Sequence, residues 1–404
     1  MRILFLSPRL CVPQFTGARL REYHIARALA QHAEVTYVSF LPPGAEAPSA
    51  ADLPFFRDIH LVPTPRRYSS LRIARGLVSR WPLTVINYTS EEMKSLVAGI
   101  VTARPFDLIH IDGFSMAAYA PFLESISHSP VRVVYNWHNI VSEALRRYSS
   151  NVKSVPRKLY ASLTARRAEG VERMLLRSGF GHAVCSVREQ QQLLAIEPRA
   201  RIVVVENGVD TDYFSGTAAS TLTPTRSRIV FVGSMDYYPN TEAVVLFARH
   251  IWPRIRERFP EWHFTIVGSN PGPAVIELRS ERNVEVTGTV PDIRPYYGDA
   301  VAAVVPLRTG GGTRLKILEA MAAGVPVVSS TLGAEGLEVT PGRDLLIADD
   351  AEDWLLALAS LCQQPSRWSE LAAAGRALVL ARYDWQMLGD RLYESYRQWL
   401  ADAG

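Results

Sequence analysis

Cysteine, lysine and long apolar stretches are all scarce in this sequence of 404 residues. The three cysteines lie far apart, which argues against a disulfide framework or a zinc site and favours small buried side chains in a reducing compartment. No apolar run reaches about eighteen residues, so no membrane-spanning helix is expected. The apolar segment at residues 2–6 is too short for a signal peptide and indicates a first strand. We therefore expect a cytoplasmic protein.

Two common motifs are also missing. No Gly-x-Gly-x-x-Gly follows the first strand, which argues against a dehydrogenase. No Arg-rich, aromatic-interleaved motif of a known nucleic-acid-binding module occurs, so nucleic acid is not an expected partner. The hydrophobic content of 48% and charged content of 21% are those of a folded protein. The length exceeds what one hydrophobic core supports, so two domains of roughly 200 residues are expected.

Short β-branched runs alternate with helical patterns along both halves of the chain. Repeated β-α-β units of this kind predict an α/β protein with two parallel, doubly wound sheets. The predicted strands cover 2–7, 35–39, 108–111, 131–135, 183–186 and 202–205, then 229–232, 264–267, 284–287, 303–306 and 327–328. The clearest predicted helices cover 19–32, with Leu20, Ile25 and Leu29 on the inner side, then 156–178, 313–323, 354–363, 368–381 and 385–401.

A stretch poor in large apolar side chains, Ser215–Ser227, divides the chain near its middle. It is rich in Ser, Thr, Ala, Gly and Pro, as a boundary between domains should be. We predict an N-terminal domain at 1–212, a linker at 213–227, a C-terminal domain at 228–383 and a final helix at 384–404.

The segment Pro306–Ser330 has the clearest chemistry. A buried strand at 301–305 leads into Gly310, Gly311 and Gly312, and a helix follows from about Thr313 to Ala323. Glycines let a ligand approach the backbone, and N–H groups at a helix N-terminus attract an anion. Three cations stand nearby to supplement them, namely Arg308, Arg314 and Lys316. Lys316 is one of only four lysines among forty-four basic residues.

Charge is unevenly distributed between the two halves. Residues 1–210 contain 26 basic and 17 acidic residues, whereas the rest contains 18 and 23. A basic N-terminal half could attract an anionic membrane surface or a phosphorylated acceptor. The alternative is a solvated surface in an Arg-rich protein.

Several motifs together give this chain a recognisable resemblance. They are Thr16-Gly17, Trp137-His138-Asn139, Asn207-Gly208-Val209-Asp210, Phe231 to Met235 with Pro239-Asn240, the whole of Pro306–Ser330, and Gly333 to Leu337. The chain resembles the GT-B glycosyltransferases, and within them family 4, whose members transfer sugars from nucleotide donors with retention of configuration. The resemblance covers essentially the full length. It implies two Rossmann-like domains facing each other across a cleft, with the final helix crossing back to the N-terminal domain.

The resemblance also implies roles for individual residues. The C-terminal domain would hold the donor, with Gly233, Ser234 and Met235 near the nucleotide and Glu319 on the ribose. The loop along the diphosphate and sugar would comprise Arg308, Gly310, Gly311, Gly312, Thr313, Arg314, Leu315 and Lys316. The catalytic candidates would be His138, close to the donor sugar, and Gly17, which approaches the diphosphate from the other domain. Asn207 and Glu335 are further candidates, although Asn207 with Gly208 equally suits a simple turn.

The sequence departs from the family pattern at Gly311. Family 4 usually has a glutamate eight positions before the one that corresponds to Glu319, and this chain has glycine there. The identity of the sugar therefore cannot be inferred from the loop. The Arg and Lys usual after the nucleotide-binding strand are also absent, because Ser234-Met235-Asp236-Tyr237 stands in their place. Arg308, Arg314 and Lys316 are the candidates to supply that positive charge.

The expected function is transfer of a sugar from a UDP-, GDP- or ADP-sugar to an acceptor, without a cofactor or metal. The acceptor would be a glycan, a lipid-linked carrier or a small molecule, as in bacterial exopolysaccharide or surface-glycan synthesis. The pair Asp210 and Asp212 is interpreted as a turn and not a metal site. A sugar-nucleotide epimerase of the same fold, or a nucleotide-binding scaffold without catalysis, remains an alternative.

Overall fold

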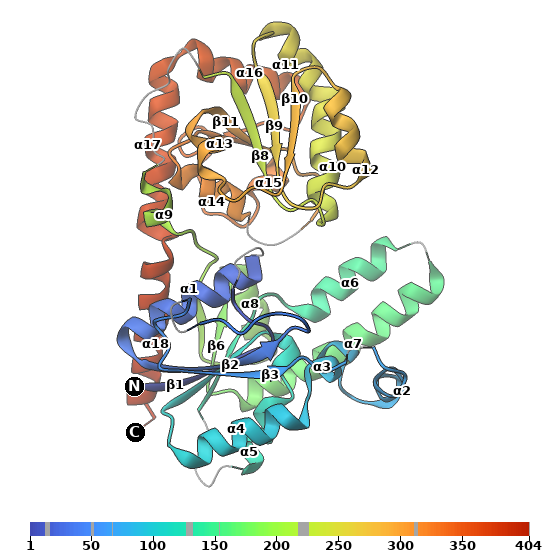
Figure 1. The fold of residues 1–404 in the computed structure, drawn as a ribbon, viewed down its shortest axis with the longest axis vertical. Coiled ribbons are helices and arrows are strands. Elements are labelled where there is room, and N and C mark those ends of the chain that lie inside the picture. Colours follow the sequence, from blue (N-terminus) through green and yellow to red (C-terminus); the bar gives the residue numbers. More distant parts are fainter. Residues whose placement is uncertain are drawn as a thin grey trace. The chain divides into compact units, whose positions relative to one another are not determined.

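The computed structural model of the chain describes residues 1–12, 17–49, 52–66, 68–126, 132–152, 154–216, 226–310 and 314–403 (Figure 1). Among the predicted site residues, Gly311, Gly312 and Thr313 lie outside these ranges, as do Thr16 and most of the predicted linker. The chain forms two compact units. Unit 1 comprises Met1–Glu206 and Leu388–Gly404, and unit 2 comprises Asn207–Met387.

The units divide slightly before the predicted domain end at residue 212. The Val209 N–H donates to the carbonyl of Tyr383 at 2.8 Å, and the two segments pair there through an isolated parallel bridge. Phe214 is buried in the core of unit 2. Residues 207–212 therefore belong to the second unit.

Unit 1 is built on a parallel seven-stranded sheet in the order β3-β2-β1-β4-β5-β6-β7. Its strands are β1 (Arg2–Ser7), β2 (Glu34–Leu41), β3 (Asp58–Pro63), β4 (Leu108–Asp112), β5 (Val133–Asn136), β6 (Gly181–Val184) and β7 (Ile202–Val204). Helices cover both faces of the sheet (Figure 1). The central strands β1, β4, β5 and β6 are therefore buried along nearly their whole length.

The helices of unit 1 connect successive strands. They are α1 (Gly17–His32), α2 (Ser70–Val78), α3 (Leu83–Tyr88), α4 (Glu91–Ala103), α5 (Tyr119–Ile126), α6 (Val141–Asn151), α7 (Val155–Ser178) and α8 (Val187–Ile196), with a 3₁₀ turn η1 (Phe114–Met116). Ile25 and Leu29 of α1 are buried as predicted, but Leu20 is only half-buried. Arg21 and Glu22 are buried instead.

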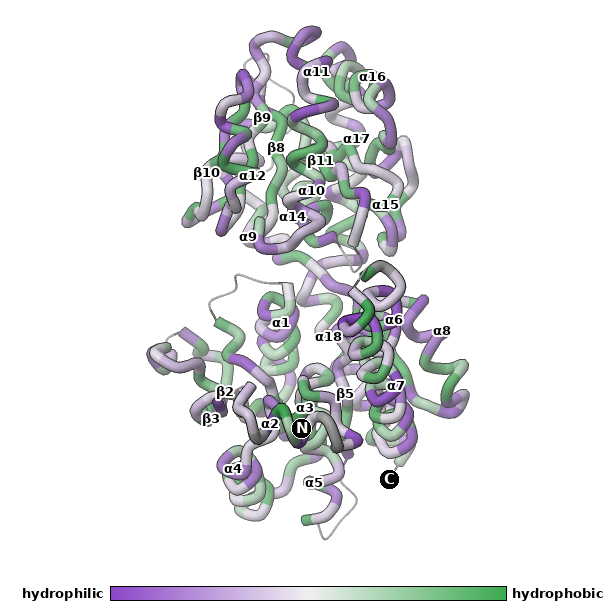
Figure 2. Tube along the Cα trace, turned by 90° about the vertical axis from the view of Figure 1, so that its right-hand side faces the viewer, coloured by the Kyte–Doolittle hydropathy of each residue, from purple (hydrophilic) through white to green (hydrophobic). Residues whose placement is uncertain are grey.

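Unit 2 repeats the design with a second core of its own. Its parallel sheet has the order β10-β9-β8-β11-β12-β13. The strands are β8 (Arg228–Val232), β9 (His263–Val267), β10 (Val284–Gly288), β11 (Ala300–Val305), β12 (Val327–Ser329) and β13 (Leu346–Ile347). Figure 2 shows the central strands β8, β9 and β11 as largely hydrophobic, which is typical of a sheet covered on both faces.

The helices of unit 2 are mostly short until its C-terminal end. They are α9 (Thr211–Ser215), α10 (Tyr238–Leu246), the π-helix η2 (Phe247–Ile251), α11 (Trp252–Arg258), α12 (Pro273–Ile276), the 3₁₀ turn η3 (Glu277–Ser280), α13 (Arg294–Gly298), α14 (Leu315–Ala322), α15 (Thr331–Ala334), α16 (Ala351–Gln363) and α17 (Pro365–Arg382). Asp210 caps α9 by accepting from the Tyr213 N–H at 2.9 Å, which confirms the turn interpretation of the Asp210–Asp212 pair.

The last helix, α18 (Trp385–Ala401), packs within unit 1 from Leu388 onward. Leu388, Leu392 and Tyr396 are fully buried at intervals of four residues, which is the spacing of one helix face. The Tyr396 hydroxyl lies 2.7 Å from Nδ1 of His110 on β4. Among the described residues, no helix is both long and apolar enough to cross a membrane.

We predict that Gly389→Ala destabilises the protein, because a Cβ at this position of α18 would overlap Ala28 of α1. Overpacking of this kind costs about 1–3 kcal/mol. The matched control is Gly99→Ala inside α4, where a Cβ meets no atom within 4 Å. Alanine there should be neutral or stabilise by about 0.5–1 kcal/mol. Urea unfolding measures both variants, and equal stabilities would contradict the packing of α18 on α1.

Candidate functional site

The predicted donor-binding residues of unit 2 lie near the point where the strand order of its sheet reverses. Strands β8 and β11 are neighbours, and the chain proceeds from β8 toward β10 on one side and from β11 toward β13 on the other. The loops that leave the carboxyl ends of β8 and β11 therefore diverge, and ligands of α/β proteins bind at such a point. Gly233 follows β8 and Pro306 follows β11.

Lys316 reaches this edge from α14. Its Nζ donates to Oδ1 of Asn240 at 2.6 Å and lies 4.0 Å from the ring centroid of Phe231. Asn240 in turn donates from Nδ2 to the carbonyl of Ser234 at 2.7 Å. A Cβ on Gly233 would come within 2.9 Å of both the Asn240 amide and the Lys316 ammonium. Glycine at 233 thus allows the lysine to approach the backbone at the end of β8.

The pKa values of Lys316 and Glu319 both depart from their ordinary values at this edge of the sheet. Burial and the nearby charge of Arg314 together lower the pKa of Lys316 to about 7, while Glu319 acts in the opposite direction. Burial raises the pKa of Glu319 to about 7, while Lys316 acts in the opposite direction. Each of the two groups therefore changes charge near neutral pH. A bound anion would favour the charged lysine.

The described part of the Gly-loop is held against α10. Gly310 has φ of +102°, and a Cβ there would meet the Tyr237 hydroxyl at 2.9 Å and Pro239 at 3.0 Å. Thr309 donates to Glu242 at 2.6 Å. On the far side of the loop, Arg314 is 4% exposed, and burial lowers its pKa. Leu315 begins α14. The structure therefore brings both ends of the loop to the β8–β11 edge.

The other donor candidates differ in position. Ser234 and Met235 lie next to Gly233, where the Met235 N–H donates to the Ser269 carbonyl at 2.9 Å. Arg308 is exposed and lines a cavity of about 160 Å³. That cavity also includes Ser330 and Asp349 but none of Gly233, Lys316 and Glu319. Arg308 therefore lines a cavity that the described residues of the Lys316 cluster do not line.

Asn207 and Glu335 lie in other parts of unit 2, although the charge of Glu335 acts against the lowering of the pKa of Arg314 by burial beside the Gly-loop. Asn207 is the first residue of unit 2 and is half-buried. Glu335 is exposed and directly follows α15. Glu335 therefore acts on the charge at the end of the Gly-loop, and both residues stay candidates.

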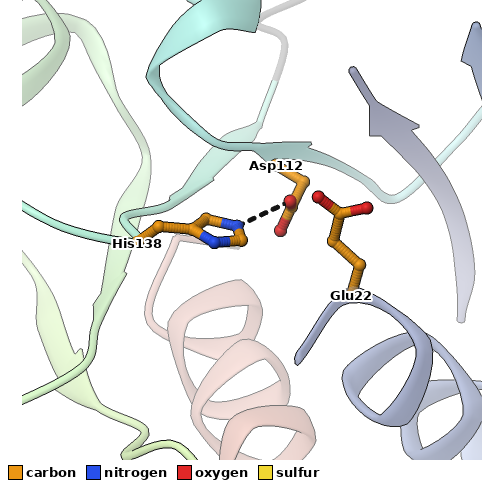
Figure 3. A group of neighbouring side chains, drawn as sticks. All are labelled: Glu22, Asp112 and His138. Carbon is orange, nitrogen blue, oxygen red and sulfur yellow. Dashed lines mark hydrogen bonds and ion pairs between the residues drawn. The ribbon is translucent and has the colours of Figure 1, made fainter. Parts of the chain in front are cut away.

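His138 in unit 1 lies at the equivalent edge, where β1 and β4 are neighbours and the chain diverges. Its Nε2 is 2.7 Å from Oδ2 of Asp112, the last residue of β4 (Figure 3). Asn136 donates to the other carboxylate oxygen of Asp112 at 2.6 Å. Arg21 of α1 donates to Oδ1 of Asn136 at 2.8 Å and to the Val205 carbonyl at 2.7 Å. These contacts fix the orientation of the His138 imidazole through its Nε2 atom.

Asp112 is ionised in this network. Burial alone would raise its pKa, but the contacts with His138 and His110 outweigh burial and hold the pKa well below its usual range. The ionised carboxylate of Asp112 accepts a hydrogen bond from the N–H at Nε2 of His138. The other ring nitrogen, Nδ1, is then left to act on a substrate. The His138 side chain is 20% exposed, whereas Asp112 is fully buried.

Glu22 forms the third member of this group (Figure 3). Atoms of Glu22, Asp112 and His138 that can bind a metal all lie within 4.8 Å of one another. Burial and the neighbouring Asp112 raise the pKa of Glu22 well above its usual range. Arg9 lies 3.0 Å from Glu22, and Ser7 donates to it at 3.0 Å. Arg9 compensates the charge of ionised Glu22, and the raised pKa of Glu22 favours its neutral, protonated form. Both effects weaken the attraction of the group for a cation.

Three of these residues were not predicted from the sequence: Arg21, Glu22 and Asp112. A signal existed for Glu22, because it precedes Ile25 and Leu29 by three and seven residues and so lies on the buried face of α1. Asp112 ends a strand, as site residues of α/β sheets do. The predicted catalytic Gly17 is the exposed first residue of α1, and its neighbour Thr16 lies outside the described residues.

Two family models match most of the chain. The model of Glycosyltransferase Family 4 matches residues 16–213, and that of Glycosyl transferases group 1 matches residues 226–364. A D-inositol 3-phosphate glycosyltransferase of Rhodococcus jostii is 30% identical over 218 residues, which are 49% of this chain and 47% of that protein. A GDP-mannose-dependent monoacylated alpha-(1-6)-phosphatidylinositol monomannoside mannosyltransferase of Corynebacterium glutamicum is 30% identical over 152 residues, 35% of this chain and 40% of that protein. The chain spans about half the length, or less, of these curated relatives.

Solved structures share the complete fold. Sucrose-phosphate synthase from Thermosynechococcus elongatus has a TM-score of 0.71 at 19% identity, with all of both chains covered. HepE of Anabaena, in complex with UDP and glucose, has a TM-score of 0.65 at 16% identity, with 98% of both chains covered. At these identities the likeness establishes the fold, which is the predicted GT-B architecture.

We predict that Glu22→Gln stabilises the protein increasingly as the pH rises above 4.5, the ordinary pKa of a glutamate. A carboxyl whose pKa is raised by folding favours the folded state while protonated and loses that contribution as it ionises. Glutamine stays neutral, so the Tm difference from wild type should be small at pH 4 and positive at pH 8. Each kcal/mol corresponds to roughly 2–4 °C at this size. Exposed Glu34→Gln is the control. A difference independent of pH would contradict the buried, protonated Glu22.

Proposed function

The chain belongs to the family 4, group 1 glycosyltransferases, and from this membership we propose that it transfers a sugar from a nucleotide-diphosphate sugar to an acceptor with retention of configuration. The donor would be a UDP-, GDP- or ADP-sugar. No cofactor or metal would take part.

One observation carries the donor assignment. The ammonium of Lys316 and the amide of Asn240 lie against Gly233 at the β8–β11 edge, and Glu319 follows Lys316 by three residues on the same helix. A cation beside an open backbone suits a diphosphate. A carboxylate one turn away suits the paired hydroxyls of a ribose. In this proposal the diphosphate would contact Lys316 and the ribose would contact Glu319, both on α14.

Sugar transfer from a nucleotide donor depends more on stabilising the charge of the transition state than on covalent catalysis by the protein. Negative charge grows on the leaving diphosphate as the sugar becomes an oxocarbenium-like ion. Preorganised donors at that position lower the barrier, and removing one costs roughly 3 kcal/mol. Lys316 is held by Asn240 and Phe231 before any ligand arrives. Its pKa of about 7 would rise when a diphosphate binds, so the cation would be fully formed when the bond breaks.

His138 would act on the sugar or the acceptor. A histidine backed by a buried carboxylate keeps one tautomer and one ring orientation, which is what proton transfer requires. Asp112 supplies that carboxylate, and Asn136 holds it. In this proposal Asp112 is a positioning residue, since it contacts the imidazole and not the substrate.

The acceptor would be a glycan or a lipid-linked carrier in surface-glycan or exopolysaccharide synthesis at the inner face of the membrane. The name of the Corynebacterium glutamicum relative gives its acceptor as an acylated phosphatidylinositol mannoside. The excess of basic residues in the N-terminal half, 26 against 17 acidic, is compatible with such a location.

Glu319→Ala should weaken nucleotide-diphosphate binding about 10- to 100-fold, because hydrogen bonds to a charged group contribute about 1.5–3 kcal/mol. A thermal-shift screen of UDP, GDP and ADP first identifies the nucleotide. Isothermal titration then compares wild type, Glu319→Ala and the control Glu277→Ala, an exposed glutamate of unit 2. Unchanged affinity in Glu319→Ala would remove it from the ribose site.

His138→Ala should lower the rate of transfer at least about a hundredfold, as loss of an acid–base group does. Asp112→Asn should lower it less, because the imidazole remains. Neither change should alter nucleotide affinity more than about twofold. The assay follows product with the nucleotide sugar found above, and exposed His250→Ala is the control.

Three other outcomes of this assay would each contradict part of the proposal. Wild-type turnover in His138→Ala would exclude it from the site. Turnover of donor without an acceptor would favour an epimerase. Loss of activity in EDTA that a divalent cation restores would contradict the metal-independent mechanism.

A further inference from the structure

The α6–α7 hairpin of unit 1 has an unusual charge distribution. Between Glu143 and Glu169 the sequence contains seven basic residues and no acidic residue. Helices α6 and α7 run antiparallel, pack closely against each other, and extend away from the sheet of unit 1 (Figure 1). The C-terminal end of α6 and the N-terminal end of α7 therefore lie away from the sheet of unit 1.

The same end of the hairpin exposes large apolar side chains. Val155 is 75% exposed, Leu159 71% and Leu163 45%, and they follow one another at the four-residue spacing of a single helix face. Tyr160 and Tyr148 are each about half exposed beside them. Every residue from Val155 to Tyr160 is exposed. Large apolar side chains gathered in this way mark an interaction surface.

The cations at this end are available to a partner. Arg146 and Arg147, farther back, form ion pairs with Glu169 and Glu143. Arg157, Lys158 and Arg166, in contrast, have no acidic or carbonyl partner among the described residues. Arg157 and Lys158 lie between Val155 and Leu159 on α7, and Arg166 follows Leu163 by three residues. Apolar side chains and unpaired cations on one protruding helix end match the surface of an anionic bilayer.

We propose that the outer end of the α6–α7 hairpin, which comprises Val155 to Arg166 with Tyr148, inserts into the interface of an anionic membrane. Val155, Leu159 and Leu163 enter the boundary between headgroups and acyl chains, as the apolar face of an interfacial helix does. Arg157, Lys158 and Arg166 remain at the level of the lipid phosphates, where each contributes about 1 kcal/mol. The tyrosines suit the same boundary, since one end of the ring is apolar and the other is polar.

Other occupants fit the hairpin less well. A second copy of the chain would bring Arg157, Lys158 and Arg166 against the same three cations, and like charges repel. Nucleic acid would pair with the cations but would leave the exposed valine and leucine side chains in water. The proposal deepens the membrane location put forward with the proposed function. It does not depend on sugar transfer, because lipid binding is measured without donor or acceptor.

Co-sedimentation with vesicles tests the proposal. Vesicles of phosphatidylcholine alone are compared with vesicles that also contain phosphatidylglycerol, using the full-length protein. We expect binding only to the anionic vesicles, with an affinity that falls as salt is added. The double variant Val155→Ser with Leu159→Ser should lower binding about tenfold or more. Arg157→Glu with Lys158→Glu should abolish it.

Matched changes in unit 2 serve as controls. Leu356→Ser replaces a leucine that is 59% exposed on α16, and Arg254→Glu reverses an exposed charge on α11. Both should bind vesicles like wild type. Melting temperature and nucleotide affinity, measured in parallel, should be unchanged in all four variants. A hairpin variant that keeps nucleotide affinity but loses vesicles supports the proposal whatever the outcome of the transfer assay.

Three results would overturn the proposal. Vesicle binding by the hairpin variants equal to wild type would exclude this surface. Equal binding to neutral vesicles would exclude the role of the cations. A dimer, seen by sedimentation velocity and abolished by the apolar variants while wild type ignores vesicles, would assign the surface to a second copy of the chain.

Discussion

Parallel strands end at one edge of a sheet, and in each unit of this protein two neighbouring strands send the chain in opposite directions from that edge. This constraint decides where the functional groups lie. The connections that follow the two strands run apart at this point, which is where ligands of open α/β sheets bind. In unit 1 the point lies between β1 and β4, beside Asp112 and His138. In unit 2 it lies between β8 and β11, beside Gly233 and Lys316.

The two edges bury opposite charges, and each charge is held in a different way. Unit 2 holds the ammonium of the half-buried Lys316 against an amide oxygen and an aromatic face, which leaves its charge for an incoming anion. Unit 1 buries the carboxylate of Asp112 among hydrogen-bond donors, which directs the charge onto His138. Burial makes an unpaired charge costly, so both arrangements lose free energy of folding in exchange for groups that are oriented before substrate arrives.

Most of the sheet could be predicted from the sequence, because buried parallel strands are short β-branched runs. The strands that escaped prediction are the edge strands β3 and β13, whose half-buried residues carry no continuous apolar signal. The Lys316 cluster was predicted in part, since lysine is rare and follows glycines. Arg21 and Asp112 were not predicted, because their partners lie more than twenty residues away in sequence, and only the fold brings them together. Leu20 was expected inside α1 from its apolar character, but the polar side chains of Arg21 and Glu22 are buried instead.

The glycine at position 311 changes the electrostatics of the donor cradle. A glutamate there would stand five residues before Lys316 and add a negative charge to the loop that is proposed to face a diphosphate. The remaining acid on this segment, Glu319, has a pKa raised to about 7 by burial, so at neutral pH it carries only part of its charge. The cradle is therefore more positive than one with both glutamates. Such a loop gains attraction for the diphosphate and loses a carboxylate that could select among sugar hydroxyls. In the proposed function, selectivity for the sugar would come from backbone groups and from the shape of the site.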